Sequence, residues 1–152
     1  MQTQQSTRSA SSARNIRRRM LAVTAVVVSA LVLTGCLNEH GQRSFDLMNA
    51  ERRANRMHEL VNDADLNARA QQWADHLAAT GRLAHSTMTI PPGATRVAEN
   101  VGYSGSVGDV HARLMASAPH RANILDARMT RVGIGATVDP QGRVWIVQLF
   151  AN

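Results

Sequence analysis

Residues 131–150 read RVGIGATVDPQGRVWIVQLF, and this stretch decides the fold. Apolar side chains occupy every second position of 131–138, which predicts a strand. The sequence DPQG at 139–142 has the residue types of a tight turn. Residues 144–150 are apolar on both faces, which is typical of a central strand covered on each side. We therefore predict a hairpin whose second strand is buried in the middle of a sheet.

Upstream, apolar spacing predicts a helix from about Phe45 to residue 58 or 60, with Ser44 as its cap. Its expected buried positions recur every three or four residues: Leu47, Ala50, Ala54, Met57 and Val61. The opposite face, which includes Arg52, is expected to be exposed. Residues 36–44, before this helix, are expected to form a polar tether.

A second helix is predicted from Asp63 or Asp65, either of which can cap it, to about Thr80, with Gly81 as its left-handed stop. Residues 82–105 then form a long connection with a short strand at 97–103.

A third helix is predicted to open at the capping box formed by Ser106 and Asp109 and to end at Pro119. Helices followed by a hairpin buried on two faces predict the α+β class. The expected architecture is a three-layer α-β-α sandwich with a small, mainly antiparallel sheet.

The charge of the chain is unevenly distributed. All 17 basic residues among the 152 are Arg, and five of them lie in the first 35 residues, which hold no acidic residue. From Cys36 onward 12 Arg stand against 11 acidic residues, so the bulk charge gives no reason to expect a nucleic-acid partner. The remaining length suits one domain, and a single Cys excludes an internal disulfide.

Residues 1–35 have the pattern of a signal peptide: an Arg-rich start, then the uncharged stretch MLAVTAVVVSALVL at 20–33. The following LTGC at 33–36 resembles the bacterial lipobox. That resemblance implies cleavage before Cys36, a lipid (diacyl) anchor on its thiol, and attachment to the outer face of the bacterial cell membrane. The alternative is an uncleaved signal anchor at 20–37 followed by an unmodified Cys.

Seven short motifs follow one another over residues 45–151 in an order and spacing that resemble the bacterial branch of the CAP superfamily, also called SCP. The name stands for cysteine-rich secretory protein, antigen five and pathogenesis-related one. The motifs are LMNxxR at 47–52, WADxLA at 73–78, AHS at 84–86, AEN at 98–100, APHRANIL at 118–125, RVGIG at 131–135 and WIVQLF at 145–150. The resemblance implies a CAP domain at 45–152 with an α-β-α sandwich.

Family members place two His and two Glu across a central cleft. The resemblance assigns His85, Glu99 and His120 to three of these positions. Ser117 stands where the second Glu is expected, and Leu114 stands where a Trp is expected. Asn100, next to Glu99, is assigned to the same cleft.

These residues allow two interpretations. His85 and His120 can hold a divalent metal such as zinc, with Glu99 as a base for bound water. Because Ser117 is not acidic, we expect the acceptor that would orient an imidazole to be lost. Alternatively the residues order loops: Glu99 accepts backbone N–H groups, His85 caps a helix exit and His120 satisfies free carbonyls.

Three functions are consistent with this pattern. The first is a non-catalytic binding module for a small, lipid-like or protein ligand, and the incomplete His/Glu set favours it. The second is a metal-assisted hydrolase that acts on peptides, and the third is a structural scaffold of the cell envelope.

Overall fold

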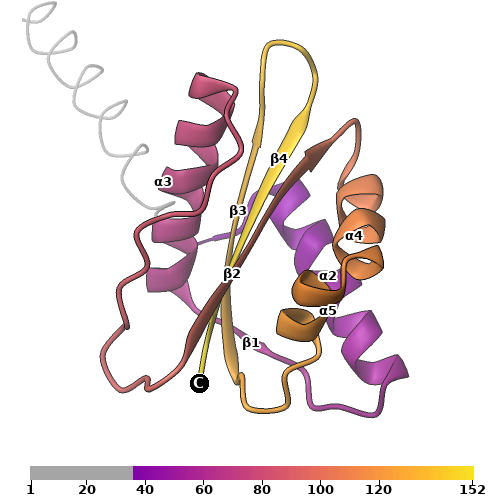
Figure 1. Cartoon of the computed structure of the whole chain (residues 1–152), viewed down its shortest axis with the longest axis vertical. Coiled ribbons are helices and arrows are strands. Elements are labelled where there is room, and N and C mark those ends of the chain that lie inside the picture. Colours follow the sequence, from indigo (N-terminus) through magenta and orange to yellow (C-terminus); the bar gives the residue numbers. More distant parts are fainter. Residues whose placement is uncertain (1–35) are drawn as a thin grey trace, which may run out of the picture. The chain divides into compact units, whose positions relative to one another are not determined.

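The structure, a computed structural model, describes residues 36–152, and the signal-peptide prediction for residues 1–35 falls outside them. The elements are shown in Figure 1. They run α2 (Glu39–Ala54), β1 (Val61–Asn62), α3 (Ala64–Thr80), β2 (Val97–Ser104), α4 (Val107–Ala116), α5 (Ala118–Ile124), β3 (Arg131–Val138) and β4 (Val144–Ala151). Within this part of the chain no helix has the length and apolar character needed to cross a membrane.

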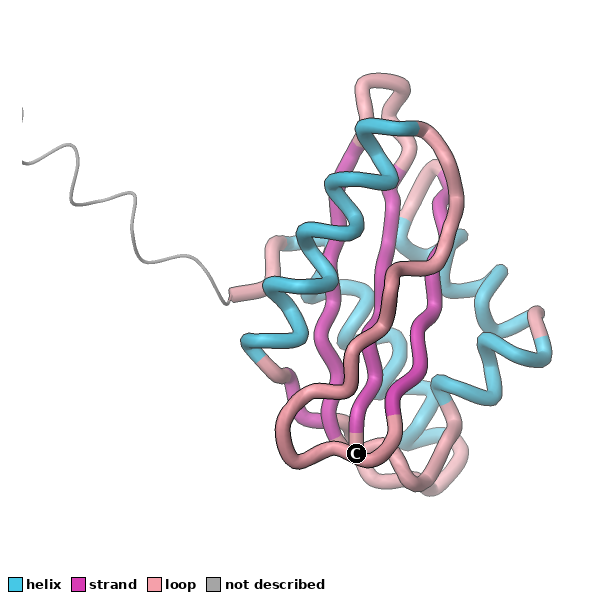
Figure 2. Tube along the Cα trace, turned by 60° about the vertical axis from the view of Figure 1, so that its left-hand side comes forward, coloured by secondary structure: helices cyan, strands magenta, loops and turns pink. Residues whose placement is uncertain are grey.

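The predicted hairpin forms the middle of the sheet. Strand β4 pairs antiparallel with β3 and with β2, while the short β1 pairs parallel with β3, which gives the order β1-β3-β4-β2. Every residue of β4 is buried except the half-buried Leu149, as expected of a central strand. Helix α3 covers one face of the sheet, and α2, α4 and α5 cover the other (Figures 1 and 2). The three-layer sandwich with a mainly antiparallel sheet is therefore confirmed.

Two glycines of the RVGIG motif let α3 lie directly on β3. A Cβ on Gly133 would lie 2.1 Å from the carbonyl carbon of Leu66, and one on Gly135 would lie 2.1 Å from the carbonyl oxygen of Ala70. Real side chains do not approach backbone atoms so closely, so only glycine fits at both positions. The other face of β3 carries Val132, Ile134 and Ala136 toward the core shared with α2 and α4.

The predicted signals at the ends of α3 are confirmed. The Asp63 carboxylate accepts hydrogen bonds from the backbone N–H groups of Asp65 and Leu66, and Gly81 ends the helix with a φ of 65°. At α4, the Ser106 hydroxyl accepts from the Asp109 N–H as the capping box predicts. The predicted stop at Pro119 is wrong: α4 already ends at Ala116, and Pro119 lies in the first turn of α5. Proline suits that position because a first-turn N–H has no helical partner.

The prediction for α2 is wrong in both its start and its buried face. The helix begins at Glu39, so most of the expected tether is helical, and its cap is Asn38 rather than Ser44. It ends at Ala54, before residue 58. Its buried residues are one apolar side chain, Met48, and four small or polar residues: Gly41, Ser44, Asn49 and Arg52. Phe45 and the predicted Leu47 are only partly buried against the core. Apolar periodicity misses such a face because it counts only apolar residues.

Arg52, expected on the exposed side, is fully buried. Its guanidinium donates to the carbonyl oxygens of His58 at 2.8 Å, Ile124 at 2.7 Å and Asp126 at 3.1 Å. Burial lowers the pKa of Arg52 below its ordinary value, and the nearby Asp126 acts to raise it. One side chain thus joins the end of α2 to the segment that follows α5.

Candidate functional site

The carboxylate of Glu99 joins the long connection to strand β2. Its side chain is fully buried, and Oε1 lies 2.6 Å from Nδ1 of His85 and 2.9 Å from the backbone nitrogen of Ser86. Oε2 of the same carboxylate has no hydrogen-bond partner. The expectation that Glu99 accepts a loop N–H is confirmed, whereas His85 contacts this carboxylate instead of capping α3.

With the carboxylate of Glu99 ionised, this contact determines which nitrogen of His85 carries a proton. An ionised carboxylate only accepts hydrogen bonds, so Nδ1 must donate to Glu99 Oε1. In the neutral imidazole Nε2 is then the acceptor. The side chain of His85 is 57% exposed, so this ring can contact a molecule from solvent.

The second pair lies at the junction of α4 and α5. Ser117 ends one helix and precedes the other, and its Oγ lies 2.8 Å from Nδ1 of His120. The expectation that loss of the acidic residue leaves an imidazole without an orienting partner is therefore wrong for His120. A hydroxyl can donate to this nitrogen or accept from it, so Ser117 can hold the ring in either tautomer.

Asn100 holds the segment of the second pair against β2 through hydrogen bonds. Its Nδ2 donates to the carbonyl oxygen of His120 at 3.1 Å and to Oε1 of Gln148 at 3.1 Å. Asn123 Nδ2 donates to Asn100 Oδ1 at 2.9 Å. Asn123 Nδ2 also donates to the backbone carbonyl oxygen of Glu99 at 3.5 Å. These bonds hold α5 against the backbone of β2 at Glu99 and Asn100, while the side chains of these two residues point to opposite faces of the strand.

The sequence prediction missed Gln148 and Asn123 as members of this network. Gln148 is fully buried, and its Nε2 also donates to the hydroxyl of Ser44 at 3.2 Å. A single amide among the apolar residues of WIVQLF is a recognisable signal, because a buried polar side chain needs a partner.

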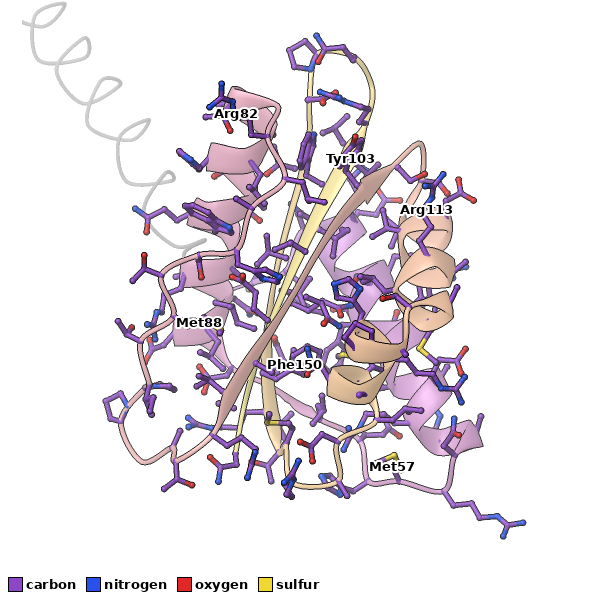
Figure 3. The ribbon with its side chains drawn as sticks, in the orientation of Figure 1. Met57, Arg82, Met88, Tyr103, Arg113 and Phe150 are labelled. Atoms are coloured by element: carbon purple, nitrogen blue, oxygen red, sulfur yellow. The ribbon has the colours of Figure 1, made fainter. Side chains whose placement is uncertain are left out.

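A cavity of about 580 Å³ opens between β2 and α4. Figure 3 shows Tyr103 on β2 and Arg113 on α4 at the same end of the molecule. The cavity also reaches the second pair, and Asp and Glu are absent from its lining. It is lined by Leu83, Val101, Gly102, Tyr103, Ser104, Val110, Arg113, Leu114, Ser117 and His120. The lining includes Ser117 and His120 but neither His85 nor Glu99. We refer to this cavity, together with the two pairs, as the cleft.

A second cavity, of about 390 Å³, lies between α3 and the loop at 86–91. Trp73 from the helix, Met88 from the loop and Phe150 from β4 contribute to its apolar wall, and Figure 3 labels the latter two. Arg69 of α3 donates to the carbonyl oxygen of Thr89 at 3.1 Å, which fastens the loop over this cavity.

The donor set does not make a metal centre. Among residues 36–152, no three His, Cys, Asp or Glu side chains are arranged to hold a metal ion. Catalytic zinc sites usually have three protein ligands, so the side chains present do not fit that group. The chemistry of the cleft is that of two oriented imidazoles and one buried carboxylate.

Comparison with known proteins decides the family. The cysteine-rich secretory protein family, CAP, matches residues 45–150. This chain belongs to the CAP family. The match covers most of the CAP domain expected at 45–152, and it supports the assignment that the seven motifs suggested. No curated protein sequence matches the chain.

Solved structures share the CAP fold at low sequence identity. An outer surface protein from Borrelia burgdorferi superimposes with a TM-score of 0.67 at 15% identity, over 78% of this chain and 98% of that one. An extracellular SCP-domain protein from Bacillus anthracis gives 0.63 at 20% identity, over 78% and 45%. Venom allergen-like protein 4 of Schistosoma mansoni gives 0.62 at 10%, over 76% and 89%. This chain thus spans less than half of the Bacillus protein but nearly all of the Borrelia protein.

Proposed function

We propose that this CAP domain is a non-catalytic binding module that takes its ligand in the cleft between β2 and α4. We further propose that a lipid on Cys36 holds it at the outer face of the bacterial cell membrane. The ligand is bound between the His85–Glu99 pair and the Ser117–His120 pair.

The unpartnered Oε2 of Glu99 is the observation that carries the binding role. Nearly all buried polar atoms in folded proteins have a hydrogen-bond partner, and an unsatisfied one costs about 1–3 kcal/mol. A ligand that donates an N–H or O–H to this oxygen recovers that free energy. The exposed His85 ring beside it supplies a second polar contact. The cavity between β2 and α4, which includes Ser117 and His120 in its lining, supplies apolar contact area next to the second pair.

The donor set favours binding over metal-assisted hydrolysis. Each imidazole is held through Nδ1 by Glu99 or Ser117, an arrangement that metal-binding His also use, but a third protein ligand is missing among residues 36–152. The hydrolase and scaffold interpretations are outcomes of the experiment below.

Two observations support the membrane anchor. Cys36 is exposed and its thiol is free, directly after the lipobox-like LTG. Two similar structures are named an outer surface protein and an extracellular protein, which agrees with a position outside the cell.

The test uses residues 37–152, which lie within the compact unit Gly35–Asn152. The unfolding temperature is measured with zinc chloride, with a lysophospholipid and with fragments from digested bacterial cell wall. We expect at least one organic probe to raise it for the wild type and for the control Glu59→Gln, which alters an exposed carboxylate. Glu99→Gln should lose this response.

A domain that no probe stabilises, or an equal response of Glu99→Gln, would contradict the binding role. Cleavage of wall peptides that is lost on chelation would favour the hydrolase instead. Retention of envelope partners by Glu99→Gln, with loss on replacement of surface Arg, would favour the scaffold.

A further inference from the structure

We propose that the anchored domain rests with the outer edge of β3 against the membrane and opens its cleft toward water. The ligand of the cleft then reaches it from the aqueous side and not from the bilayer. This inference rests on the lipid anchor proposed above.

The first step is the shortness of the link between Cys36 and the folded domain. Leu37 is half-buried and packs against the core. Asn38 is fixed twice, because its side chain accepts from the Gly41 N–H at 2.8 Å and donates to the Ala136 carbonyl oxygen at 2.7 Å. Consecutive Cα atoms lie about 3.8 Å apart, so Cys36 stays within about 8 Å of Asn38. A lipid on Cys36 would therefore hold the domain close to the bilayer.

The second step is the position of this link on the sheet. Beyond β1, side chains occupy the backbone groups on the free edge of β3. Asn67 Oδ1 accepts from the Ile134 N–H at 2.8 Å, and Gln71 Oε1 accepts from the Ala136 N–H at 3.1 Å. Asn38 Nδ2 donates to the Ala136 carbonyl oxygen on the same edge. The chain thus enters the domain at the β3 edge, which these side chains also block against another strand.

The third step is that the cleft lies at the opposite edge of the sheet. In the order β1-β3-β4-β2, strand β4 separates β3 from β2, whose residues 101–104 line the cavity. Strands are about 4.8 Å apart, so the two edges are about 10 Å apart in backbone alone. In Figure 2 the described chain starts beyond one edge of the sheet, at the left, while α4 and α5 lie toward the other edge, at the right. An anchor at one edge therefore directs the other edge away from the membrane.

This orientation also limits the ligand. A bilayer lipid would have to leave the membrane and pass the thickness of the domain to enter the cleft. A solute, or a molecule fixed in the wall, reaches it directly. Arg113 in the cavity lining favours a solute with an anionic group at that end, while the Glu99 carboxylate of the first pair requires an N–H or O–H donor.

The experiment uses the full chain, expressed in bacteria, purified with its lipid and placed in vesicles that contain spin-labelled phospholipids. Cys36 is the only Cys of the chain, so once it is acylated an introduced Cys is the only free thiol. A fluorophore is attached at Val138→Cys on β3, where the native side chain is 47% exposed, or at Arg113→Cys beside the cleft. The spin labels quench fluorophores that lie close to the bilayer.

We expect at least threefold stronger quenching at position 138 than at position 113. Equal quenching, or stronger quenching at 113, in a chain shown by mass spectrometry to be acylated would overturn the orientation while leaving the anchor intact. A chain recovered without an acyl group would overturn the anchor and the orientation together.

A matched variant tests the role of the short link. Ten Gly and Ser residues inserted between Cys36 and Leu37 leave every contact of Asn38 in place but free the domain from the membrane surface. The difference in quenching between positions 138 and 113 should then fall to less than half of its value in the chain without the insertion. A difference that persists unchanged would show that the link does not set the orientation.

Discussion

Glu99 Oε1 lies 2.6 Å from His85 Nδ1, while Oε2 of the same buried carboxylate has no partner. The first contact orients an exposed imidazole, and the second atom is an acceptor that remains unused in the folded chain. Glu99 of β2 therefore orders the neighbouring loop through Oε1 and has a free acceptor, Oε2, for a ligand.

The ordering role predicts the behaviour of Glu99→Gln. The neutral amide loses the charge-assisted bonds to His85 and Ser86, and bonds to charged groups contribute about 1.5–3 kcal/mol. Amide hydrogen exchange at Ser86 should therefore become at least about tenfold faster, because 1.4 kcal/mol corresponds to a factor of ten. Glu59→Gln is the control. Unchanged exchange at Ser86 would show that the carboxylate does not hold the loop.

Arg52 and Arg53 are adjacent but should respond very differently to Lys substitution. Arg52→Lys leaves several buried carbonyl oxygens without a donor, at about 1–3 kcal/mol each. The free energy of unfolding should fall by about 3 kcal/mol or more, measured by urea denaturation. Arg53 forms an exposed ion pair with Glu59, so Arg53→Lys should change the free energy of unfolding by less than about 1 kcal/mol. Equal effects would contradict the buried role of Arg52.

The close approach of α3 to β3 predicts opposite results for two Gly→Ala variants. Gly133→Ala forces the helix backbone away from the strand, and overpacking of this kind costs about 1–3 kcal/mol or more. Gly108 lies within α4, where a Cβ would meet nothing closer than 3.8 Å, so Gly108→Ala should stabilise by about 0.5–1 kcal/mol. Thermal unfolding of both variants checks this. A stable Gly133→Ala protein would rule out the close packing.

The lowered pKa of Asp139 leads us to expect that this residue contributes to the loss of stability of the fold in acid. Burial of its carboxyl acts to raise the pKa, but hydrogen bonds from Trp145 Nε1 and from Arg143 outweigh this and lower the pKa to about 2. The unfolded carboxyl titrates near about 4, so the unfolded chain binds more protons between these values and stability falls as pH falls from about 4 to 2.

In Asp139→Asn the loss of stability between pH 4 and pH 2 should be smaller than in the wild type, although not absent. The hydrogen bond from Arg128 also lowers the pKa of Asp126 to about 2, and that residue is retained. Unfolding measured at pH 2, 3, 4 and 7 checks the difference, with the exposed Asp46→Asn as control. A wild-type pH profile in Asp139→Asn would mean that Asp139 does not contribute.

Much of the fold could be predicted because its signals are local. The turn at 139–142, the alternation in β3 and the caps at Asp63 and Ser106 each act over a few residues. The path of α2 could not be predicted in this way. Its buried face includes the polar residues Ser44, Asn49 and Arg52, whose hydrogen-bond partners lie outside the helix. Their polarity therefore predicted the wrong side of the helix as buried.

The cleft was predictable only in part, for the same reason. The motifs identified His85, Glu99 and His120, and the structure pairs the first two directly. The partnership of Ser117 with His120 depends on the turn between α4 and α5. Gln148 and Asn123 both bond to Asn100, which lies 48 and 23 residues away from them along the chain. Contacts between residues so far apart in the sequence produce no local pattern from which they could be predicted.

The most direct test of ligand binding in the cleft is NMR of the imidazole rings during titration with soluble cell-wall fragments. We predict that the ring signals of His85 and His120 move together and saturate, while that of His40 in the first turn of α2, which lines neither cavity, does not. Saturating shifts at His40 alone, or no shift at either cleft histidine, would contradict the binding role.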